Sequence, residues 1–135
     1  MNGRAREAHL RFTERRRRED EAPRLHTEVP RLRTLRLDVE ERRGESSLAE
    51  TRHVRHVVVD HAPALFVLGC GDPDCRDGGH DVTDALVRHL GEHSTSFSLE
   101  DVCMGHLRGA PCGRIVRVLV TATYADPSPK PHSPP

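Results

Sequence analysis

The stretch Arg114–Tyr124, R-I-V-R-V-L-V-T-A-T-Y, has the strongest strand-forming sequence in the 135-residue chain. β-Branched residues occupy more than half of its positions, and they suit the half-buried surface of a pleated sheet. The run is long enough to cross the middle of a sheet. We therefore expect it to be a central strand, with the other elements assembled around it.

Three apolar runs earlier in the chain also predict strands or parts of strands. In L-R-T-L-R-L-D-V-E (32–40) apolar and polar residues alternate, which is the period of a strand with one buried face. The runs V-R-H-V-V-V-D (54–60) and A-L-F-V-L-G (64–69) flank the short connection H-A-P. We expect these two runs to pair as a hairpin whose second strand leads directly to Cys70.

Residues 81–90 predict the one helix of the domain. Asp81 suits the N-cap position, and Gly91 suits the position just after the helix. The apolar face of this helix consists of residues at helical spacing: Val82, Ala85, Leu86, His89 and Leu90.

The segment S-F-S-L-E-D-V-C (96–103) predicts a strand with Phe97 and Leu99 on one face. The predicted order of elements is therefore β-β-β-α-β-β. This order favours an α+β domain in which one helix packs on a small, mostly antiparallel sheet.

The two ends differ in composition from the middle of the chain. Residues 1–30 carry few apolar side chains and no helical apolar stripe, so we expect an Arg-rich arm without fixed structure. Residues 125–135 are Pro-rich, and proline neither pairs within a sheet nor continues a helix. The prediction is a disordered arm over 1–30, a four-cysteine domain over 31–124 and a disordered tail over 125–135.

Charge is unevenly distributed, although the formal net charge is zero. Residues 1–36 hold eleven Arg against six acidic residues, a balance of +5, and the rest of the chain has a balance of −5. The arginines from Arg4 to Arg36 could contact phosphates, so nucleic-acid binding through this arm is one alternative function. The interspersed acids and the scarcity of aromatic residues for base stacking make it less favoured.

The four cysteines of the chain form two pairs. Cys70 and Cys75 enclose G-D-P-D, and Cys103 and Cys112 enclose M-G-H-L-R-G-A-P. Glycine and proline favour turns in both segments, and each pair adjoins a predicted strand. Two short turns that each supply two thiolates are the usual construction of a tetrahedral zinc site. We therefore predict a zinc-ribbon-like site in which all four cysteines hold one zinc ion.

Other interpretations of the cysteines stay open. The spacings C-x4-C and C-x8-C are looser than the repeated C-x2-C of many zinc sites, and a [2Fe-2S] cluster or free or disulfide-forming thiols are the alternatives. His80, at the start of the predicted helix, is an auxiliary candidate that could replace a cysteine or hydrogen-bond to a sulfur. Four thiolates leave excess negative charge around the ion, and Arg76 and Arg108 are candidates for compensating it.

No apolar run approaches the roughly eighteen residues needed to cross a bilayer, and no hydrophobic signal region follows the first basic residues. We expect a cytoplasmic protein without membrane contact. In a reducing cytosol, paired cysteines are more typical of metal ligands than of structural disulfides.

Residues 64–124 resemble a group of small uncharacterised bacterial proteins with the pattern C-x-D-P-x-C-x-D-G-G-H-D-V-T, a short helix and two further cysteines before a strand ending in A-T-Y. The resemblance implies that Cys70, Cys75, Cys103 and Cys112 are the ligand set, and it implies no activity. The order of L-F-V-L-G-C, helix and C-M-G is also similar to that of thioredoxin-like [2Fe-2S] ferredoxins. The wide last pair and the hairpin around H-A-P depart from that second family.

The preferred function is a non-catalytic structural-zinc module, acting as a binding or interaction protein with a protein partner. Four cysteines would close the coordination shell, and no Glu is spaced to act as a general base, so an enzyme is less favoured. A thiol or [2Fe-2S] redox protein is the first alternative, and nucleic-acid binding through Arg4–Arg36 is the second.

Overall fold

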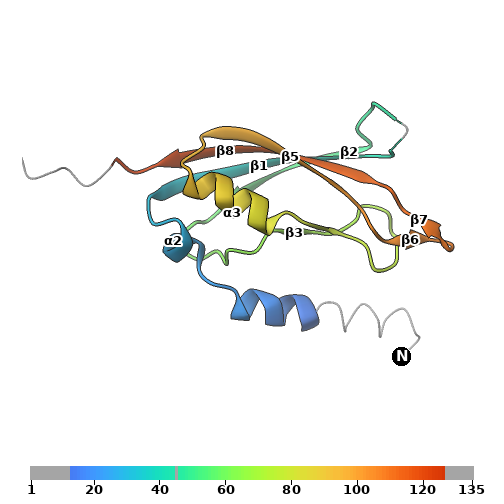
Figure 1. The fold of residues 1–135 in the computed structure, drawn as a ribbon, viewed down its shortest axis with the longest axis horizontal. Helices are drawn as coiled ribbons and strands as arrows, with labels where there is room; N and C mark the ends of the chain where they lie inside the picture. The colour runs from blue at the N-terminus through green and yellow to red at the C-terminus, as the bar shows by residue number, and fades with distance from the viewer. Residues whose placement is uncertain (1–12, 45, 127–135) are drawn as a thin grey trace, which may run out of the picture.

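The computed structural model describes residues 13–44 and 46–126. Its centre is a four-stranded sheet in the order β2-β1-β8-β5, in which every neighbouring pair is antiparallel (Figure 1). β8 lies between β1 and β5, which confirms the prediction of a central strand. The four strands are β1 (Leu32–Arg42), β2 (Thr51–Val57), β5 (Ser96–Val102) and β8 (Ile115–Tyr124).

Alternation along the two central strands determines which face of the sheet is buried. The side chains of Leu35, Leu37 and Val39 point into the core, as their spacing predicts. In β8, every second residue from Val116 to Ala122 is buried as well. Because strand side chains alternate between faces, these rows bring the apolar side chains of both strands to one side.

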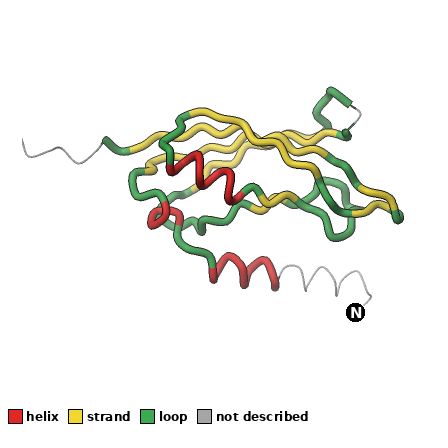
Figure 2. Tube along the Cα trace, in the orientation of Figure 1, coloured by secondary structure: helices red, strands yellow, loops and turns green. Residues whose placement is uncertain are grey.

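One layer of helix and loop covers the buried face of the sheet (Figures 1 and 2). It contains α2 (Leu25–Glu28) and α3 (Thr83–Gly91). Leu86 and Leu90 of α3 are completely buried, and Phe66 from the loop beside it fills the same core. The arrangement confirms the predicted α+β class, with an antiparallel sheet, few short helices and four clustered cysteines.

The ends of α3 differ slightly from the prediction. Helix α3 begins at Thr83, and the Asp81 carboxylate accepts a hydrogen bond from the Thr83 amide at 3.1 Å, so Asp81 supports the first turn from just outside it. Gly91 lies within the helix and does not occupy the position after it. That role falls to His93, which has a positive φ of 59°, while the Ser94 amide donates to the His89 carbonyl.

The predicted hairpin around H-A-P is wrong. β2 pairs with β1, and β3 (Val67–Leu68) pairs with β4 (His80–Asp81) in a separate two-stranded ladder. Two strands joined by a short connection need not pair when another partner presents a longer complementary edge. Here β1 pairs with β2 over seven positions, whereas β3 is only two residues long.

The N-terminal segment is more ordered than the sequence predicts. Residues 13–21 form a helix, and α2 buries Leu25 and the following Val29 in the core. The helix over 13–21 has no apolar stripe, but Arg17 pairs with both Glu14 and Glu21 along its surface, and such pairs favour helix formation. Residues 1–12 of the predicted arm and 127–135 of the predicted tail lie outside the described residues.

Within the part of the chain that the structure describes, no helix is long and apolar enough to span a bilayer.

Candidate metal centre

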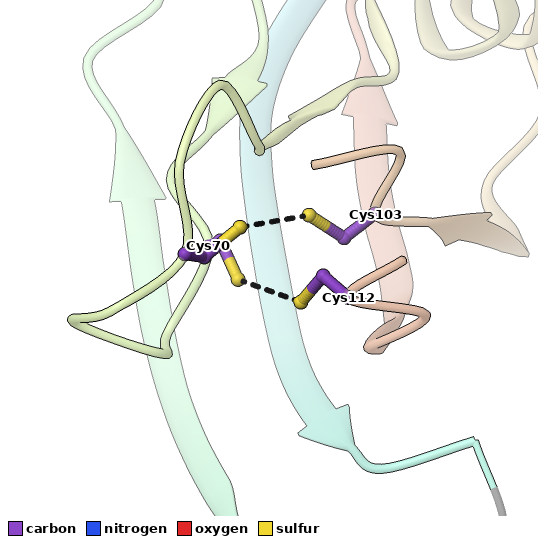
Figure 3. Close-up of side chains that lie close together, drawn as sticks. Cys70, Cys103 and Cys112 are labelled. Atoms are coloured by element: carbon purple, nitrogen blue, oxygen red, sulfur yellow. Dashed lines mark hydrogen bonds between the residues drawn. The ribbon is translucent and has the colours of Figure 1, made fainter. Parts of the chain in front are cut away.

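The sulfur atoms of the four cysteines converge at one end of the molecule. All four lie within 4.8 Å of one another. The Sγ atoms of Cys70 and Cys112 are 3.7 Å apart, and those of Cys75 and Cys103 are 3.6 Å apart. In Figure 3 the sulfurs of Cys103 and Cys112 point towards the loop that carries Cys70. Each close pair therefore joins the two cysteine segments, which are far apart in the sequence.

The first cysteine segment is a compact turn after β3. The Cys75 amide donates to the Asp72 carbonyl at 3.1 Å, and the Asp72 carboxylate accepts the Asp74 amide at 2.9 Å. These two bonds fold the chain back on itself, so that the thiols of Cys70 and Cys75 both reach the cluster. The G-D-P-D sequence thus forms the turn that its composition predicts.

The second segment adds a small hairpin between its cysteines. β6 (His106–Leu107) pairs with β7 (Ala110–Pro111), and Arg108 and Gly109 both take a positive φ in the turn between them. The Cys112 amide donates to the Gly105 carbonyl at 2.8 Å, which closes the base of this hairpin. The nine-residue separation of Cys103 and Cys112 is therefore spanned by regular structure, and both thiols return to the same place.

Backbone contacts hold the two segments together without a metal ion. Arg76 and His106 exchange two backbone hydrogen bonds, each 2.9 Å long. Close approach at this point requires glycine, since a Cβ at Gly105 would lie 2.6 Å from Cys75 Sγ and 2.6 Å from the Gly78 Cα. A Cβ at Gly78 would overlap the sulfurs of Cys75 and Cys103.

The pKa values of three thiols in the cluster are shifted, and not all in the same direction. Burial and neighbouring thiols raise the pKa of Cys70, and burial is also the main cause that raises the pKa of Cys75 to about 11. Burial also disfavours the Cys103 thiolate, but the amides of Gly79 and Gly105 outweigh it and lower the pKa of Cys103. Cys70 and Cys75 therefore keep their protons at neutral pH, and a metal ion has to displace them.

A buried ion pair links the sheet to both cysteine segments. The Glu41 carboxylate accepts the Arg114 Nε at 2.5 Å and the Gly71 amide at 2.9 Å. Glu41 is 5% exposed and Arg114 is 6% exposed, and Glu50 also accepts from Arg114 at 2.8 Å. Burial alone would lower the pKa of Arg114, but the two carboxylates outweigh it and raise that pKa, so the guanidinium stays charged.

Sequence reasoning missed this ion pair, although a signal for it exists. Glu41 continues the row of buried residues Leu35, Leu37 and Val39 on the same face of β1. An acid in line with a buried apolar row requires a buried partner. The signal for the partner is weaker, since Arg114 simply precedes the apolar run of β8.

His80 is not part of the sulfur cluster. Its side chain is completely buried, and its Nδ1 lies 3.0 Å from the Asp101 carboxylate. Its Nε2 has no hydrogen-bond partner among the described residues. The predicted role of auxiliary ligand is therefore not supported by the geometry, because the short β4 strand directs this ring into the protein interior.

Two backbone amides contact the sulfur of Cys103. The Gly79 amide donates to Cys103 Sγ at 3.4 Å, and the Gly105 amide lowers the pKa of the same thiol. The predicted candidate Arg108 lies exposed in the β6–β7 turn with a φ of 49°. Glycine at position 105 lets the backbone approach Cys75 Sγ closely, whereas sequence reasoning attributed this glycine to turn formation alone.

Several described arginines of the predicted nucleic-acid-binding segment, Arg15, Arg17, Arg18 and Arg36, make ion pairs with carboxylates of the chain. Arg17 binds Glu14 and Glu21, and Arg18 binds Asp81 at 3.1 Å. Binding of nucleic acid through Arg4–Arg36 and of a protein partner both stay predictions.

No protein-family model, curated protein or solved structure matches the chain. The resemblance of residues 64–124 to small four-cysteine bacterial proteins therefore identifies no family, and the four-cysteine cluster is the part of it that the structure supports.

The distances within the cluster fit a single metal ion. Four sulfurs placed tetrahedrally about 2.3 Å from one ion would lie about 3.8 Å apart. The two close pairs, at 3.7 and 3.6 Å, agree with this value. All four cysteines are free thiols in the structure. The donor set and its spacing are therefore compatible with a metal ion.

Proposed function

We propose that the protein is a non-catalytic structural metal-binding module whose single ion is zinc, held by Cys70, Cys75, Cys103 and Cys112. The observation that carries the proposal is the spacing of the four sulfurs, which all lie within 4.8 Å of one another. The separations of Cys70 from Cys112 and of Cys75 from Cys103, 3.7 and 3.6 Å, are those expected around one tetrahedral ion.

Two features favour one zinc ion over a [2Fe-2S] cluster. In a two-iron cluster each iron takes two of the four cysteines, so the two halves of the ligand set lie on separate metal atoms and further apart. Here every sulfur is within 4.8 Å of every other, which suits one central ion. An all-thiolate tetrahedral shell is also a standard ligand set of structural zinc.

The ion would cross-link two segments that the backbone hydrogen bonds between Arg76 and His106 already bring together. One segment follows β3, and the other runs from the end of β5 to the start of β8. Neither cysteine segment contributes a cysteine to the apolar core on the sheet. Structural zinc sites supply on the order of 10 kcal/mol of binding free energy at neutral pH, and this energy stabilises the folded arrangement.

A closed four-thiolate shell supports a structural role more than a catalytic one. Catalytic zinc sites keep one coordination position for water or substrate, and four protein ligands fill the tetrahedron. The chemistry that zinc would supply here is the neutralisation and cross-linking of four thiolates.

Elemental analysis of the purified chain, combined with thermal melting, tests the proposal. We expect one zinc ion per chain, a colourless sample, and a lower melting temperature after treatment with a strong chelator. Re-addition of zinc should restore the original melt. A metal-free protein whose melt the chelator leaves unchanged would overturn the proposal, and a brown sample containing iron and sulfide would replace zinc with a cluster.

A further inference from the structure

The four sulfurs divide into an interior pair and an outer pair. Cys75 and Cys103 are 7% and 1% exposed. Cys70 and Cys112 are only partly buried. Each pair has one cysteine from each segment, and the two pairs have nearly equal sulfur separations, 3.6 Å inside and 3.7 Å outside. The two pairs therefore differ in their exposure to solvent, but their sulfur–sulfur distances are nearly the same.

A cavity open to solvent reaches Cys112 of the outer pair. Its volume is about 570 Å³, and Cys112 forms part of its wall together with Asp72, Leu107 and Arg114. Asp72 belongs to the turn between Cys70 and Cys75, so the cavity contacts both cysteine segments. Cys112 is the one cysteine in its lining, and Cys70, Cys75 and Cys103 are absent from it. A molecule as small as hydrogen peroxide has ample room to reach Cys112.

We propose that Cys70 and Cys112 form an oxidative modification site, at which a peroxide converts the outer thiolate pair into a disulfide and releases the metal ion. This inference rests on the proposed metal-binding function. Oxidation of cysteine depends on thiolate character and exposure. Metal binding keeps all four sulfurs as thiolates, so exposure selects the outer pair.

The reaction balances with hydrogen peroxide as the two-electron oxidant. The Cys112 thiolate attacks one peroxide oxygen, the O–O bond breaks, and Cys112 becomes a sulfenic acid while hydroxide leaves. The Cys70 thiolate then attacks the Cys112 sulfur, the S–S bond forms, and a second hydroxide leaves. Two protons from solvent convert the hydroxides to water. The ion loses two of its four donors and passes to a chelator in solution.

The product would keep the two cysteine segments joined. A Cys70–Cys112 disulfide connects the same two segments that the metal ion connects, because each close pair spans both of them. The sulfur separation has to fall from 3.7 Å to about 2.05 Å, which requires the two partly buried side chains to rotate towards each other. The oxidised protein therefore exchanges a metal cross-link for a covalent one.

The test exposes the zinc-loaded chain to hydrogen peroxide in the presence of a chromogenic zinc chelator. Zinc release is followed by absorbance, and disulfides are mapped by mass spectrometry after digestion without reductant. We expect one zinc ion released for every two thiols lost, and a linked peptide containing Cys70 and Cys112. Dithiothreitol followed by zinc should restore the original metal content. A linked peptide containing Cys75 and Cys103, or an equal mixture of pairings, would overturn the inference.

Two matched variants separate the pairs. Cys103→Ser removes one ligand but leaves the outer pair intact, so it should still form the Cys70–Cys112 disulfide with peroxide. Cys112→Ser also removes one ligand but destroys the outer pair, so it should oxidise more slowly and give no such link. Mapping of the wild-type chain decides the question if either variant fails to fold.

The zinc content measured before peroxide is added separates the two proposals. A chain that carries no metal refutes the proposed function, and the inference that rests on it falls as well. A chain that carries zinc but loses it without a Cys70–Cys112 link refutes the oxidative site alone.

Discussion

Glu41 accepts hydrogen bonds from Arg114 beside one cysteine segment and from Gly71 within the other. This carboxylate lies at the end of the buried row of β1, so it connects the sheet to the sulfur cluster. A buried ion pair stabilises little by itself, because desolvation offsets most of the attraction. Breaking it is expensive, since one charge is then left buried without its partner.

Replacing Glu41 by leucine should therefore destabilise the protein strongly. We expect a loss of about 3 kcal/mol in the free energy of unfolding, the lower end of the range for buried pairs, because Glu50 still contacts Arg114. Urea unfolding monitored by circular dichroism measures it. The double variant Glu41→Leu, Arg114→Met should recover part of the loss.

The control for this prediction is Glu40→Gln on the opposite, exposed face of β1, where Glu40 pairs with Arg52. An exposed pair contributes about 1 kcal/mol or less. Equal losses from Glu40→Gln and Glu41→Leu would contradict the assignment of a buried structural role to Glu41.

Gly78 gives a second prediction at the residue scale. A methyl group there would overlap the sulfurs of Cys75 and Cys103 and force the cluster apart. We expect Gly78→Ala to lower the affinity for zinc by about tenfold or more, as changes around a metal site commonly do. Gly69→Ala is the matched control, because a Cβ at Gly69 meets no atom within 4 Å. Competition with a chromogenic chelator measures both affinities, and equal affinities would argue against the tight packing.

At the scale of the element, the first turn of α3 depends on groups outside the helix. Asp81 accepts the Thr83 amide and also the Arg18 guanidinium, each at 3.1 Å. The Thr83 hydroxyl in turn lies 2.8 Å from the Phe66 amide and accepts its hydrogen bond. These bonds attach the start of α3 to the loop just before β3 and to the helix over 13–21, and they hold α3 in place over the sheet.

The contribution of Asp81 should depend on pH. Burial disfavours its charged form, but hydrogen bonds from Thr83 and Arg18 outweigh burial and lower the pKa of Asp81. A lowered folded-state pKa contributes stability above the unfolded pKa of about 3.9, and this contribution is lost as pH falls through the folded-state value. We expect Asp81→Ala to cost about 1 kcal/mol at pH 7, as for a lost capping oxygen.

Urea unfolding of wild type and Asp81→Ala at pH 7, 5 and 3 measures this dependence. The difference between them should hold at pH 5 and shrink at pH 3. Asp81→Asn keeps an acceptor oxygen but no charge. Its free energy of unfolding at pH 7 should lie between those of the wild type and Asp81→Ala. A difference that grew as the pH fell would contradict the sign.

At the scale of the whole molecule, the apolar core and the sulfur cluster occupy different regions. Figure 1 shows α2 and α3 under one half of the sheet and β6 and β7 at its far end. The core residues of the sheet, including Val116, Val118 and Val120, are fully buried, and no cysteine belongs to their hydrophobic cluster. Removal of the metal should therefore destabilise the two cysteine segments before it affects the sheet.

Hydrogen exchange after chelation checks this separation. The amides of Gly79, Cys103 and Cys112 donate to the cluster or to the backbone around it, and they should exchange markedly faster without metal. Amides in the middle of β1 and β8 should keep most of their protection, since β8 is hydrogen-bonded on both sides. Uniform loss of protection would mean that the ion holds the entire fold.

The strand character of Arg114–Tyr124, the buried row of β1, the position of α3 and the clustering of four cysteines all followed from the sequence. These features depend on local periodicity and on turn-forming residues, which a chain carries in neighbouring positions. The cysteines could be predicted to converge because thiol pairs in turns are a recognised ligand pattern. The sequence does not show that the segment of Cys103 and Cys112 lies beside that of Cys70 and Cys75. The structure brings the two segments together.

Strand partners, the Glu41–Arg114 ion pair and the buried position of His80 were decided only by the tertiary structure. The partner of β2 depends on which edge offers the longer ladder, and no spacing between neighbouring residues records that choice. Glu41 and Arg114 are 73 positions apart, so their pairing appears only after β1 and β8 have aligned. The exposure of each sulfur likewise depends on how the two segments pack, and local sequence carries no measure of it.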